Sequence, residues 1–344
     1  MKKDIKSLTL AELKMLMESW GEPAYRAKQI FGWLHEKLVA DTGEMSNIPA
    51  NLKERLTKEC EFKTLKIITK QESEKDRTAK YLFDAGDGNL LESVFMPYRH
   101  GNSVCISSQV GCRMACSFCA SGIDGWIRNL TASEMLEQVY RIQREKGERV
   151  SNVVIMGTGE PLDNYENVVK FIQMLTREDG LKISQRNITL STCGLVPQIY
   201  RLADERLEIT LAVSLHAVND EERRKIMPVA NRYAIKEIME ATDAYFQKTG
   251  RRVSFEYSLI KGVNDSFAHA QSLAELLAGK NCHVNLIKVN PVKERNYISA
   301  TDAAASNFQN RLEKSGINVT IRREMGRDID GACGQLRRRY MKQV

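Results

Sequence analysis

The chain has 344 residues, of which 42% are apolar and 28% are charged, with 21 glycines and only 7 prolines. This composition is typical of a packed globular protein and excludes a mostly disordered, collagen-like or low-complexity chain. No apolar run approaches the ~20 residues that a membrane-spanning helix needs, so we expect no membrane partner. The net charge of +7 is modest, and its sign suits a polyanionic partner.

The eight cysteines are too sparse for a disulfide scaffold in a chain of this length. The amino end, Met-Lys-Lys-Asp-Ile-Lys, lacks the apolar stretch of a secretory signal, so we expect a cytoplasmic protein. In a reducing compartment, thiols serve as metal ligands, catalysts or small core residues. Four of the eight lie between positions 105 and 119, and this cluster is the first candidate for chemistry.

Residues 1–60 are predicted to form a small helical domain. Apolar side chains recur at helical spacing from Leu8 to Met17, and Thr9 with Glu12 are placed as a capping box. The lysines and arginines of this segment remain for its outer surface. A solvated helix face is the ordinary interpretation of such charges, and a nucleic-acid-binding face is the sharper one.

Residues 61–103 lack the helical spacing of the first segment and are predicted to form a short β extension. Strand-like runs cover residues 65–69, 78–83 and 90–95, with a turn at Gly86-Asp87-Gly88 before the third run. A further run at 104–107 opens the next segment.

Residues 104–325 are predicted to form the core of the fold. After a helix over 132–146, capped by Thr131 and Glu134, strands and helices alternate. The strands are expected at 153–156, 188–191, 209–214, 253–259, 284–289 and 319–322, and the helices at 168–175, 196–203, 235–246, 268–277 and 303–312. Right-handed crossovers of this kind build a parallel sheet, so the fold class is α/β, and six or so units predict a barrel or a partial barrel. We expect a monomer, because barrel closure would leave no unpaired strand edge.

Polar residues follow several of these strands directly. The segments are 157–161 (Gly-Thr-Gly-Glu-Pro), 191–194 (Ser-Thr-Cys-Gly), 214–216 (Ser-Leu-His) and 290–291 (Asn-Pro). Each alone could be only a turn. Because active sites of α/β barrels lie at the carboxyl ends of the strands, the four together predict a site there.

Cys112, Cys116 and Cys119 place three thiols within eight residues. A structural zinc site usually has four ligands, whereas three thiolates leave one iron of a cubane cluster open to another ligand. The ligand count favours an iron–sulfur cluster and keeps zinc as the alternative.

The spacing Cys-x3-Cys-x2-Cys resembles that of the radical S-adenosylmethionine (SAM) superfamily. The longer strings at 105–112 (Cys-Ile-Ser-Ser-Gln-Val-Gly-Cys) and 330–336 (Asp-Gly-Ala-Cys-Gly-Gln-Leu) resemble the RlmN/Cfr RNA methyltransferases. The likeness runs nearly from end to end and implies a partial (β/α)6 barrel of the radical SAM type. Glu160-Pro161 is similar to RlmN, because Cfr proteins typically carry Glu-Ala there.

This resemblance implies a 4Fe-4S cluster on Cys112, Cys116 and Cys119, with SAM chelating the fourth iron and two SAM molecules used per turnover. It implies that SAM is contacted by Gly159, Glu160, Ser191, Ser214, Leu215, His216 and Asn290. Convergent donors and acceptors at strand ends suit such a polar, zwitterionic ligand. On its own, His216 would be a satisfied structural histidine.

The resemblance also implies two catalytic thiols and a base. Cys333, in the catalytic loop and basic tail at 326–344, would carry a methyl group as S-methylcysteine; Cys105 would resolve the RNA adduct by forming a disulfide with Cys333. Glu92 matches the family's proposed general base, although a strand carboxylate is ordinarily exposed. Cys60, Cys193 and Cys282 are expected to be small buried residues.

The function implied is methylation of carbon 2 of adenosine in 23S rRNA and in tRNA. Cluster reduction by a flavodoxin or ferredoxin and a reductant for the disulfide would be needed. Basic groups at 223–225, 322–323 and 337–342 could contact phosphates, although a solubilising tail is equally ordinary. The alternatives are a Cfr-like carbon-8 methyltransferase that confers antibiotic resistance and a non-catalytic iron–sulfur or zinc RNA-binding protein.

Overall fold

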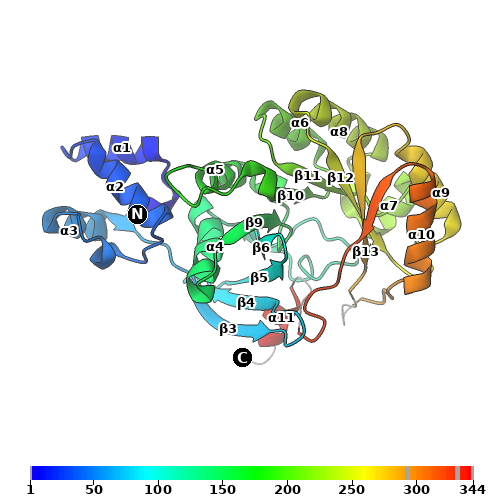
Figure 1. Cartoon of the computed structure of the whole chain (residues 1–344), viewed down its shortest axis with the longest axis horizontal. Coiled ribbons are helices and arrows are strands. Elements are labelled where there is room, and N and C mark those ends of the chain that lie inside the picture. Colours follow the sequence, from blue (N-terminus) through cyan, green and yellow to red (C-terminus); the bar gives the residue numbers. More distant parts are fainter. Residues whose placement is uncertain (1, 291–294, 330–333, 342–344) are drawn as a thin grey trace.

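The computed structural model describes residues 2–290, 295–329 and 334–341. Its amino-terminal part is helical, with α1 (Leu10–Ser19), α2 (Tyr25–His35) and α3 (Ala50–Glu59) beside a short parallel pair, β1 (Lys3–Asp4) and β2 (Cys60–Glu61) (Figure 1). The predicted capping box opens α1: Thr9 Oγ1 accepts from the Glu12 amide at 3.2 Å, and Glu12 accepts from the Thr9 amide at 2.7 Å. The apolar stripe of α1 packs into the main core, as its spacing predicts.

A ten-stranded sheet forms the centre of the molecule. Its order is β14-β13-β12-β11-β10-β9-β6-β5-β4-β3. From β6 to β14 the neighbours are parallel, and the strands are β6 (Gly101–Cys105), β9 (Val150–Ile155), β10 (Ile188–Thr192), β11 (Thr210–Ser214), β12 (Val253–Leu259), β13 (Cys282–Lys288) and β14 (Asn318–Ile321). The predicted α/β class is therefore confirmed.

The β extension continues the same sheet in the antiparallel sense. Its strands are β3 (Lys66–Glu72), β4 (Ala79–Asp84) and β5 (Leu90–Tyr98). Val94 of β5 pairs with Cys105 of β6, and Cys105 pairs in turn with Val154 of β9. The extension is thereby joined to the parallel strands through the residue expected to be a catalytic thiol.

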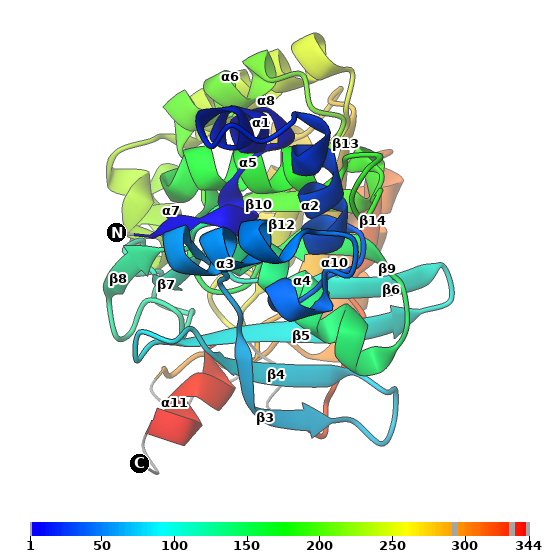
Figure 2. The ribbon, with the colours of Figure 1, turned by 90° about the vertical axis from the view of Figure 1, so that its left-hand side faces the viewer.

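Helices accompany the parallel strands in the predicted alternation. They are α4 (Ala132–Lys146), α5 (Tyr165–Leu175), α6 (Val196–Asp204), α8 (Ile235–Thr249), α9 (Phe267–Leu276) and α10 (Asp302–Lys314). A short helix that the periodicity did not predict, α7 (Asp220–Ile226), follows β11 and is capped by Asn219, whose Oδ1 accepts from the Glu222 amide at 2.9 Å. A last helix, α11 (Gln335–Met341), packs against β5 (Figure 2).

The sheet is open. Within the described residues β14 and β3 lie at its two ends and do not pair with each other. Barrel closure, the reason given for expecting a monomer, is therefore not observed, and the monomer stays a prediction. None of the helices in the described part of the chain has the length and apolar character of a membrane span.

Candidate active site

The polar strand ends meet in one cavity of about 270 Å³. Gly159 and Glu160 reach it from the end of β9, Ser191 from β10, Ser214 and His216 from β11, and Asn290 from the end of β13. Cys112, Cys116 and Cys119 line the same cavity. The structure thus brings together nine of the residues expected to hold the cluster and SAM.

The loop that carries the three cysteines runs between β7 (Gln109–Gly111) and β8 (Trp126–Asn129). The Cys112 amide donates to the Gly125 carbonyl at 3.0 Å, and the Ser117 amide donates to the Ile226 carbonyl at 2.9 Å. A small apolar cluster that includes Ile226 and Met227 packs under the loop. The loop is therefore held by the β7–β8 pair at its ends and by the end of α7 in its middle.

The donor set fits an iron–sulfur cluster. Burial raises the pKa of Cys112 to about 12 and also raises the pKa of Cys116, so thiolates there require a positive partner such as bound iron. Among the described residues, no three or more His, Cys, Asp or Glu side chains are arranged around a position for a single metal ion. A cubane takes each thiolate on a different iron, which agrees with three thiols that share a cavity without converging on one point.

Glycines bring the segment after β9 close to the neighbouring strand. A Cβ at Gly157 would lie 2.6 Å from the Ile106 carbonyl oxygen. Gly159 has φ +113°, and a Cβ there would lie 2.8 Å from the Gln109 amide nitrogen. Only glycine accommodates this approach, which places Glu160 at the wall of the cavity.

Glu160 is buried, and its carboxylate joins two strand ends. One oxygen accepts from the Leu162 amide at 3.0 Å and the other from the Cys193 amide at 2.7 Å. Burial raises the pKa of Glu160, and the hydrogen bond from the Cys193 backbone amide opposes that rise. A ligand ammonium group would supply the positive charge that this carboxylate needs.

His216 also has a fixed orientation. It adopts φ +60°, and its Nδ1 accepts from the Ser258 amide at 2.9 Å. Burial, with a contribution from Arg223, lowers the pKa of His216 to about 3, so the ring is neutral. Because Nδ1 is an acceptor, the hydrogen of the neutral ring lies on Nε2, where it can be donated to a ligand.

Leu215 is the predicted SAM contact that does not line the cavity. Its side chain is fully buried in the main core, and its carbonyl accepts from Arg223 Nε at 3.2 Å. Arg223 also donates to the carbonyls of Cys193, at 2.6 Å, and Ser214, at 3.1 Å. The expectation that Arg223 contacts RNA phosphates is therefore wrong, because its guanidinium is buried and ties the ends of β10 and β11 together.

A second cavity of about 470 Å³ adjoins the first. It is lined by Cys105 and shares Met156, Ile287, Asn290 and Arg322 with the first cavity. Burial raises the pKa of Cys105, while Arg322 and Lys80 oppose that rise. The seven described cysteines are free thiols; Cys333 lies outside the described residues, so its pairing with Cys105 stays a prediction.

Glu92 is buried, unlike an ordinary strand carboxylate, and lines neither cavity. Its Oε2 lies 3.2 Å from Lys80 Nζ and accepts from the Gly334 amide at 2.5 Å. Its Oε1 accepts from the Arg337 amide at 2.6 Å. The expected base therefore binds the backbone at the start of α11. Gly334, the first of its two partners there, directly follows Cys333 in the sequence.

The first cavity also has a carboxylate that comes from within a strand and was not predicted. Glu256, in the middle of β12, lines the first cavity and accepts from Asn285 Nδ2 at 2.9 Å. Burial raises the pKa of Glu256 to about 7. The signal that could have found it is a lone acidic residue within the otherwise uncharged strand run at 253–259. Cys193, predicted to be buried, is buried but also lines this cavity, whereas Cys60 and Cys282 are buried away from it.

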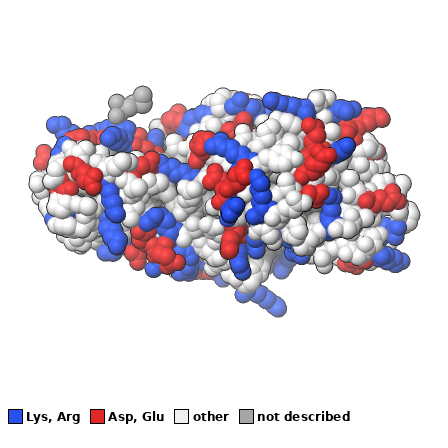
Figure 3. All heavy atoms as spheres, turned by 90° about the horizontal axis from the view of Figure 1, so that it is seen from above, with Lys and Arg blue, Asp and Glu red and all other residues white. Residues whose placement is uncertain are grey.

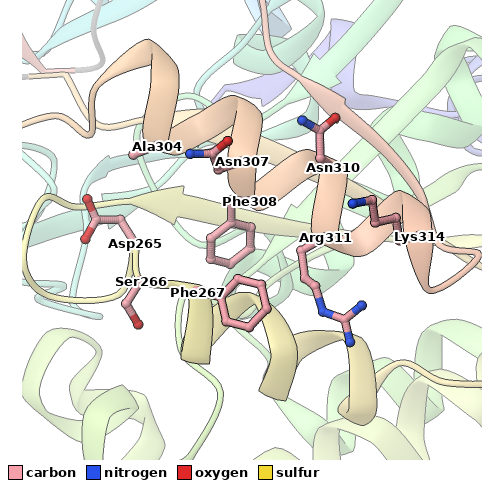
Figure 4. A pocket seen from close by; sticks show the side chains of 9 residues that line it. All are labelled: Asp265, Ser266, Phe267, Ala304, Asn307, Phe308, Asn310, Arg311 and Lys314. Carbon is pink, nitrogen blue, oxygen red and sulfur yellow. The ribbon is translucent and has the colours of Figure 1, made fainter.

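The basic carboxyl-terminal segment is also more buried than predicted. The side chain of Arg337 is buried, and Arg338 Nε lies 3.6 Å from Asp124 Oδ2. On the face shown in Figure 3, basic and acidic side chains are interspersed and form no field of one sign. A hollow between α9 and α10 is separate from the site; Figure 4 shows Phe267 and Arg311 beside it, and none of the predicted site residues lines it.

Two family models match the chain. "Radical SAM superfamily" matches residues 106–274, and "Ribosomal RNA large subunit methyltransferase N-terminal domain" matches residues 3–62. A "Probable dual-specificity RNA methyltransferase RlmN" from Lachnoclostridium phytofermentans is 61% identical over 98% of this chain and 95% of its own length. The chain belongs to the RlmN family. Another RlmN protein, from Lachnospira eligens, is 58% identical over 99% of this chain and 97% of its own length.

A solved relative of this RlmN family member confirms the fold. A radical SAM methyltransferase from Sphaerobacter thermophilus is 43% identical, covers 97% of this chain and 98% of its own, and superposes with a TM-score of 0.93. The predicted α/β radical SAM fold, the family and the enzyme class are thus confirmed. Membership in the radical SAM superfamily implies a 4Fe-4S cluster and SAM, in agreement with the thiols and polar groups of the first cavity.

Proposed function

We propose that this chain methylates carbon 2 of adenosine in 23S rRNA and in tRNA. The observation that carries the proposal is the near full-length likeness to dual-specificity RlmN proteins. The arrangement of the cavities supports it, because the space lined by three thiols and the space lined by Cys105 adjoin each other. One turnover needs the methyl group, the radical source and the RNA base close together, and two adjoining cavities provide for this.

In this proposal Cys112, Cys116 and Cys119 hold the cluster, and the polar strand ends hold SAM. Glu160 accepts from the SAM ammonium group, and His216 donates from Nε2. When bound, the cluster and SAM supply a 5′-deoxyadenosyl radical, which opens a route to an electron-poor aromatic carbon. Two SAM molecules are used, one as the methyl source and one as the radical source.

The two catalytic thiols divide the remaining work. Cys333 takes the methyl group as a thiolate nucleophile, and the first SAM leaves as S-adenosylhomocysteine. The second SAM would supply the radical that removes a hydrogen atom from this S-methyl group, and the resulting carbon radical on Cys333 adds to adenine, so that RNA is bound covalently through this residue. After the adduct gives up one electron, which the cluster would take back, and the proton on carbon 2, the Cys105 thiolate attacks the Cys333 sulfur. The disulfide forms as the bond from this sulfur to the methylene carbon breaks, and the methylene carbon takes up a proton to become the methyl group of the product. A thiol reductant restores the pair, and an electron donor of the flavodoxin or ferredoxin type serves the cluster. Glu92 takes the proton from the substrate carbon.

The test uses anaerobically reconstituted, reduced protein. Incubation with SAM should release 5′-deoxyadenosine, whereas a non-catalytic iron–sulfur or zinc RNA-binding protein would release none. With 23S rRNA or tRNA added, nucleoside mass spectrometry should show 2-methyladenosine. An 8-methyladenosine product would instead establish the Cfr-like reaction.

A further inference from the structure

The neighbouring strands β4, β5 and β6 carry two charged side chains and a thiol on the same face of the sheet. Lys80 of β4 is directly opposite Val94 of β5, and Val94 is directly opposite Cys105 of β6. Directly opposite residues of neighbouring strands point to the same face of a sheet, as do residues two apart along a strand. Glu92, two residues before Val94, therefore shares the face that carries Lys80 and Cys105.

Lys80 and Glu92 form a buried ion pair on that face. Lys80 is 0% exposed and Glu92 is 4% exposed, and Nζ lies 3.2 Å from Oε2. Removing both charges from water is costly, and such a pair contributes little net stability compared with apolar residues of similar size. The pair therefore invites a functional explanation. Lys80 also acts on Cys105, since its charge opposes the rise that burial causes in the pKa of that thiol.

The carboxylate of Glu92 makes two further contacts, both with α11 and its start. Oε2 accepts from the Gly334 amide at 2.5 Å, and Oε1 accepts from the Arg337 amide at 2.6 Å. Each oxygen thus binds one backbone amide, and Oε2 faces the ammonium group of Lys80 as well. Hydrogen bonds to a charged acceptor are roughly twice as strong as those to a neutral one. The fixation of Gly334 therefore depends on the orientation of the Glu92 carboxylate, which Lys80 contacts at the same oxygen.

We propose that Lys80 is a positioning residue for the reaction. Its ammonium group orients the carboxylate of Glu92, so that Glu92 holds Gly334, the neighbour of Cys333, on the sheet face that carries Cys105. This role rests on the proposed function, in which Cys105 and Cys333 must meet. The sheet register supplies the geometry: Lys80 and Cys105 lie on either side of β5, and the anchored segment packs on β5 itself.

The test compares Lys80→Met, Glu92→Gln and the double variant, with Lys70→Met as the control. Lys70 lies on the adjacent strand β3 in a half-exposed pair with Glu145. In the reconstituted holoenzyme, Lys80→Met should speed amide hydrogen exchange across residues 334–341 by about tenfold or more, which corresponds to loss of a charged hydrogen bond. Methylation should lose kcat with an unchanged KM for RNA. Lys70→Met should exchange and turn over as the wild type does.

The double variant separates the ion pair from simple packing. Lys80→Met strands a buried carboxylate and should lower the unfolding midpoint, whereas adding Glu92→Gln removes that charge and should restore most of the midpoint. Exchange across 334–341 should stay fast in the double variant, because a glutamine offers only one acceptor oxygen for two amides. If Lys80→Met fails to fold, recovery of folding in the double variant supports the pair.

Two outcomes would overturn the proposal: exchange in Lys80→Met as slow as in the control, or a double variant no more stable than Lys80→Met. Neither readout requires RNA methylation. Failure of the wild-type protein to methylate RNA would contradict the proposed function, whereas the exchange and stability comparisons would remain valid.

Discussion

Glu160 lies at the wall of the first cavity with both carboxylate oxygens bonded to backbone amides. Replacing it by Gln keeps the shape and removes the negative charge that we propose for the SAM ammonium group. We expect Glu160→Gln to weaken SAM binding by about tenfold or more, from the loss of a charged hydrogen bond of roughly 1.5–3 kcal/mol. Equilibrium binding of SAM to reconstituted protein measures this. Glu166→Gln, an exposed carboxylate paired with Arg201, is the matched control and should bind SAM normally.

The three clustered thiols give a second prediction for single residues. Replacing any one of Cys112, Cys116 or Cys119 by Ala leaves two protein ligands for a cubane, which hold it poorly. Each variant should lose bound iron and the broad visible absorption of the cluster after anaerobic reconstitution. Iron analysis and the absorption spectrum check this, and full iron content with normal SAM cleavage in any of them would contradict the assignment. Cys60→Ala, buried in the main core away from both cavities, should keep its iron.

Glu256 gives a prediction about pH. Burial raises its pKa from 4.5 to about 7, so the folded protein keeps a proton that the unfolded chain releases. Stability therefore falls as pH rises from about 4.5 to about 7 and is constant above that, by a total on the order of 3 kcal/mol. Glu256→Gln should remove this component. Urea unfolding of both proteins at pH 5 and pH 8 measures it, and an equal pH dependence in the two would show that Glu256 does not titrate in this range.

At the scale of elements, Arg223 joins the short helix α7 to the ends of β10 and β11. Its guanidinium binds the carbonyls of Cys193, Ser214 and Leu215. These strand ends form one wall of the first cavity, so the position of α7 and the shape of the cavity are linked. The middle of the cysteine loop is linked too, because the Ser117 amide binds the carbonyl of Ile226 at the end of α7.

We expect Arg223→Met to destabilise the protein by about 3 kcal/mol or more, because it leaves three buried carbonyls without this donor. SAM affinity should fall with it, as the ends of β10 and β11 separate. Chemical denaturation and SAM binding are the measurements. Arg224→Met, at the exposed neighbouring position, should change neither by more than about 0.5 kcal/mol.

At the scale of the whole molecule, the proposed reaction requires two distant parts of the chain to meet. Cys105 lies on β6 in the middle of the sheet, and Cys333 lies outside the described residues, next to the anchored Gly334. The proposed roles of the two thiols differ, so their replacements should fail at different stages.

We expect Cys105→Ala, made with RNA present, to carry RNA crosslinked through Cys333, because it lacks the thiol that resolves the adduct. Cys333→Ala should form neither crosslink nor methylated RNA. A nuclease-sensitive mobility shift on a denaturing gel reveals the crosslink. A shift in Cys333→Ala, or none in Cys105→Ala where the wild type turns over, would overturn the roles. Cys282→Ala is the control, since Cys282 is buried away from both cavities, whereas Cys193 lines the first one.

The alternation of core strands and helices, except for α7 and the β7–β8 pair, could be predicted from the sequence, as could the cysteine loop and the polar strand ends. These features depend on neighbours in the chain: hydrophobic periodicity, capping pairs such as Thr131 with Glu134, and motif spacing. Parallel strands then place their carboxyl ends at one edge, which is why Ser191, Ser214 and Asn290 meet in one cavity as expected. The family likeness supplied roles for residues whose chemistry spacing alone leaves open.

Only the tertiary structure decided which charged residues are buried and what they bind. Arg223 looked like part of a basic surface cluster, and Glu92 looked like an exposed strand carboxylate, yet both are buried. Glu256 stands out in the sequence as a lone acidic residue in a strand run, but only the fold shows that it faces the cavity. The partners of these groups come from distant segments: Glu92 binds Lys80 on a neighbouring strand and amides some 240 positions away. Local sequence patterns report which face of an element is apolar, but a buried charge is stable only through partners that folding brings to it, and no local pattern contains those partners.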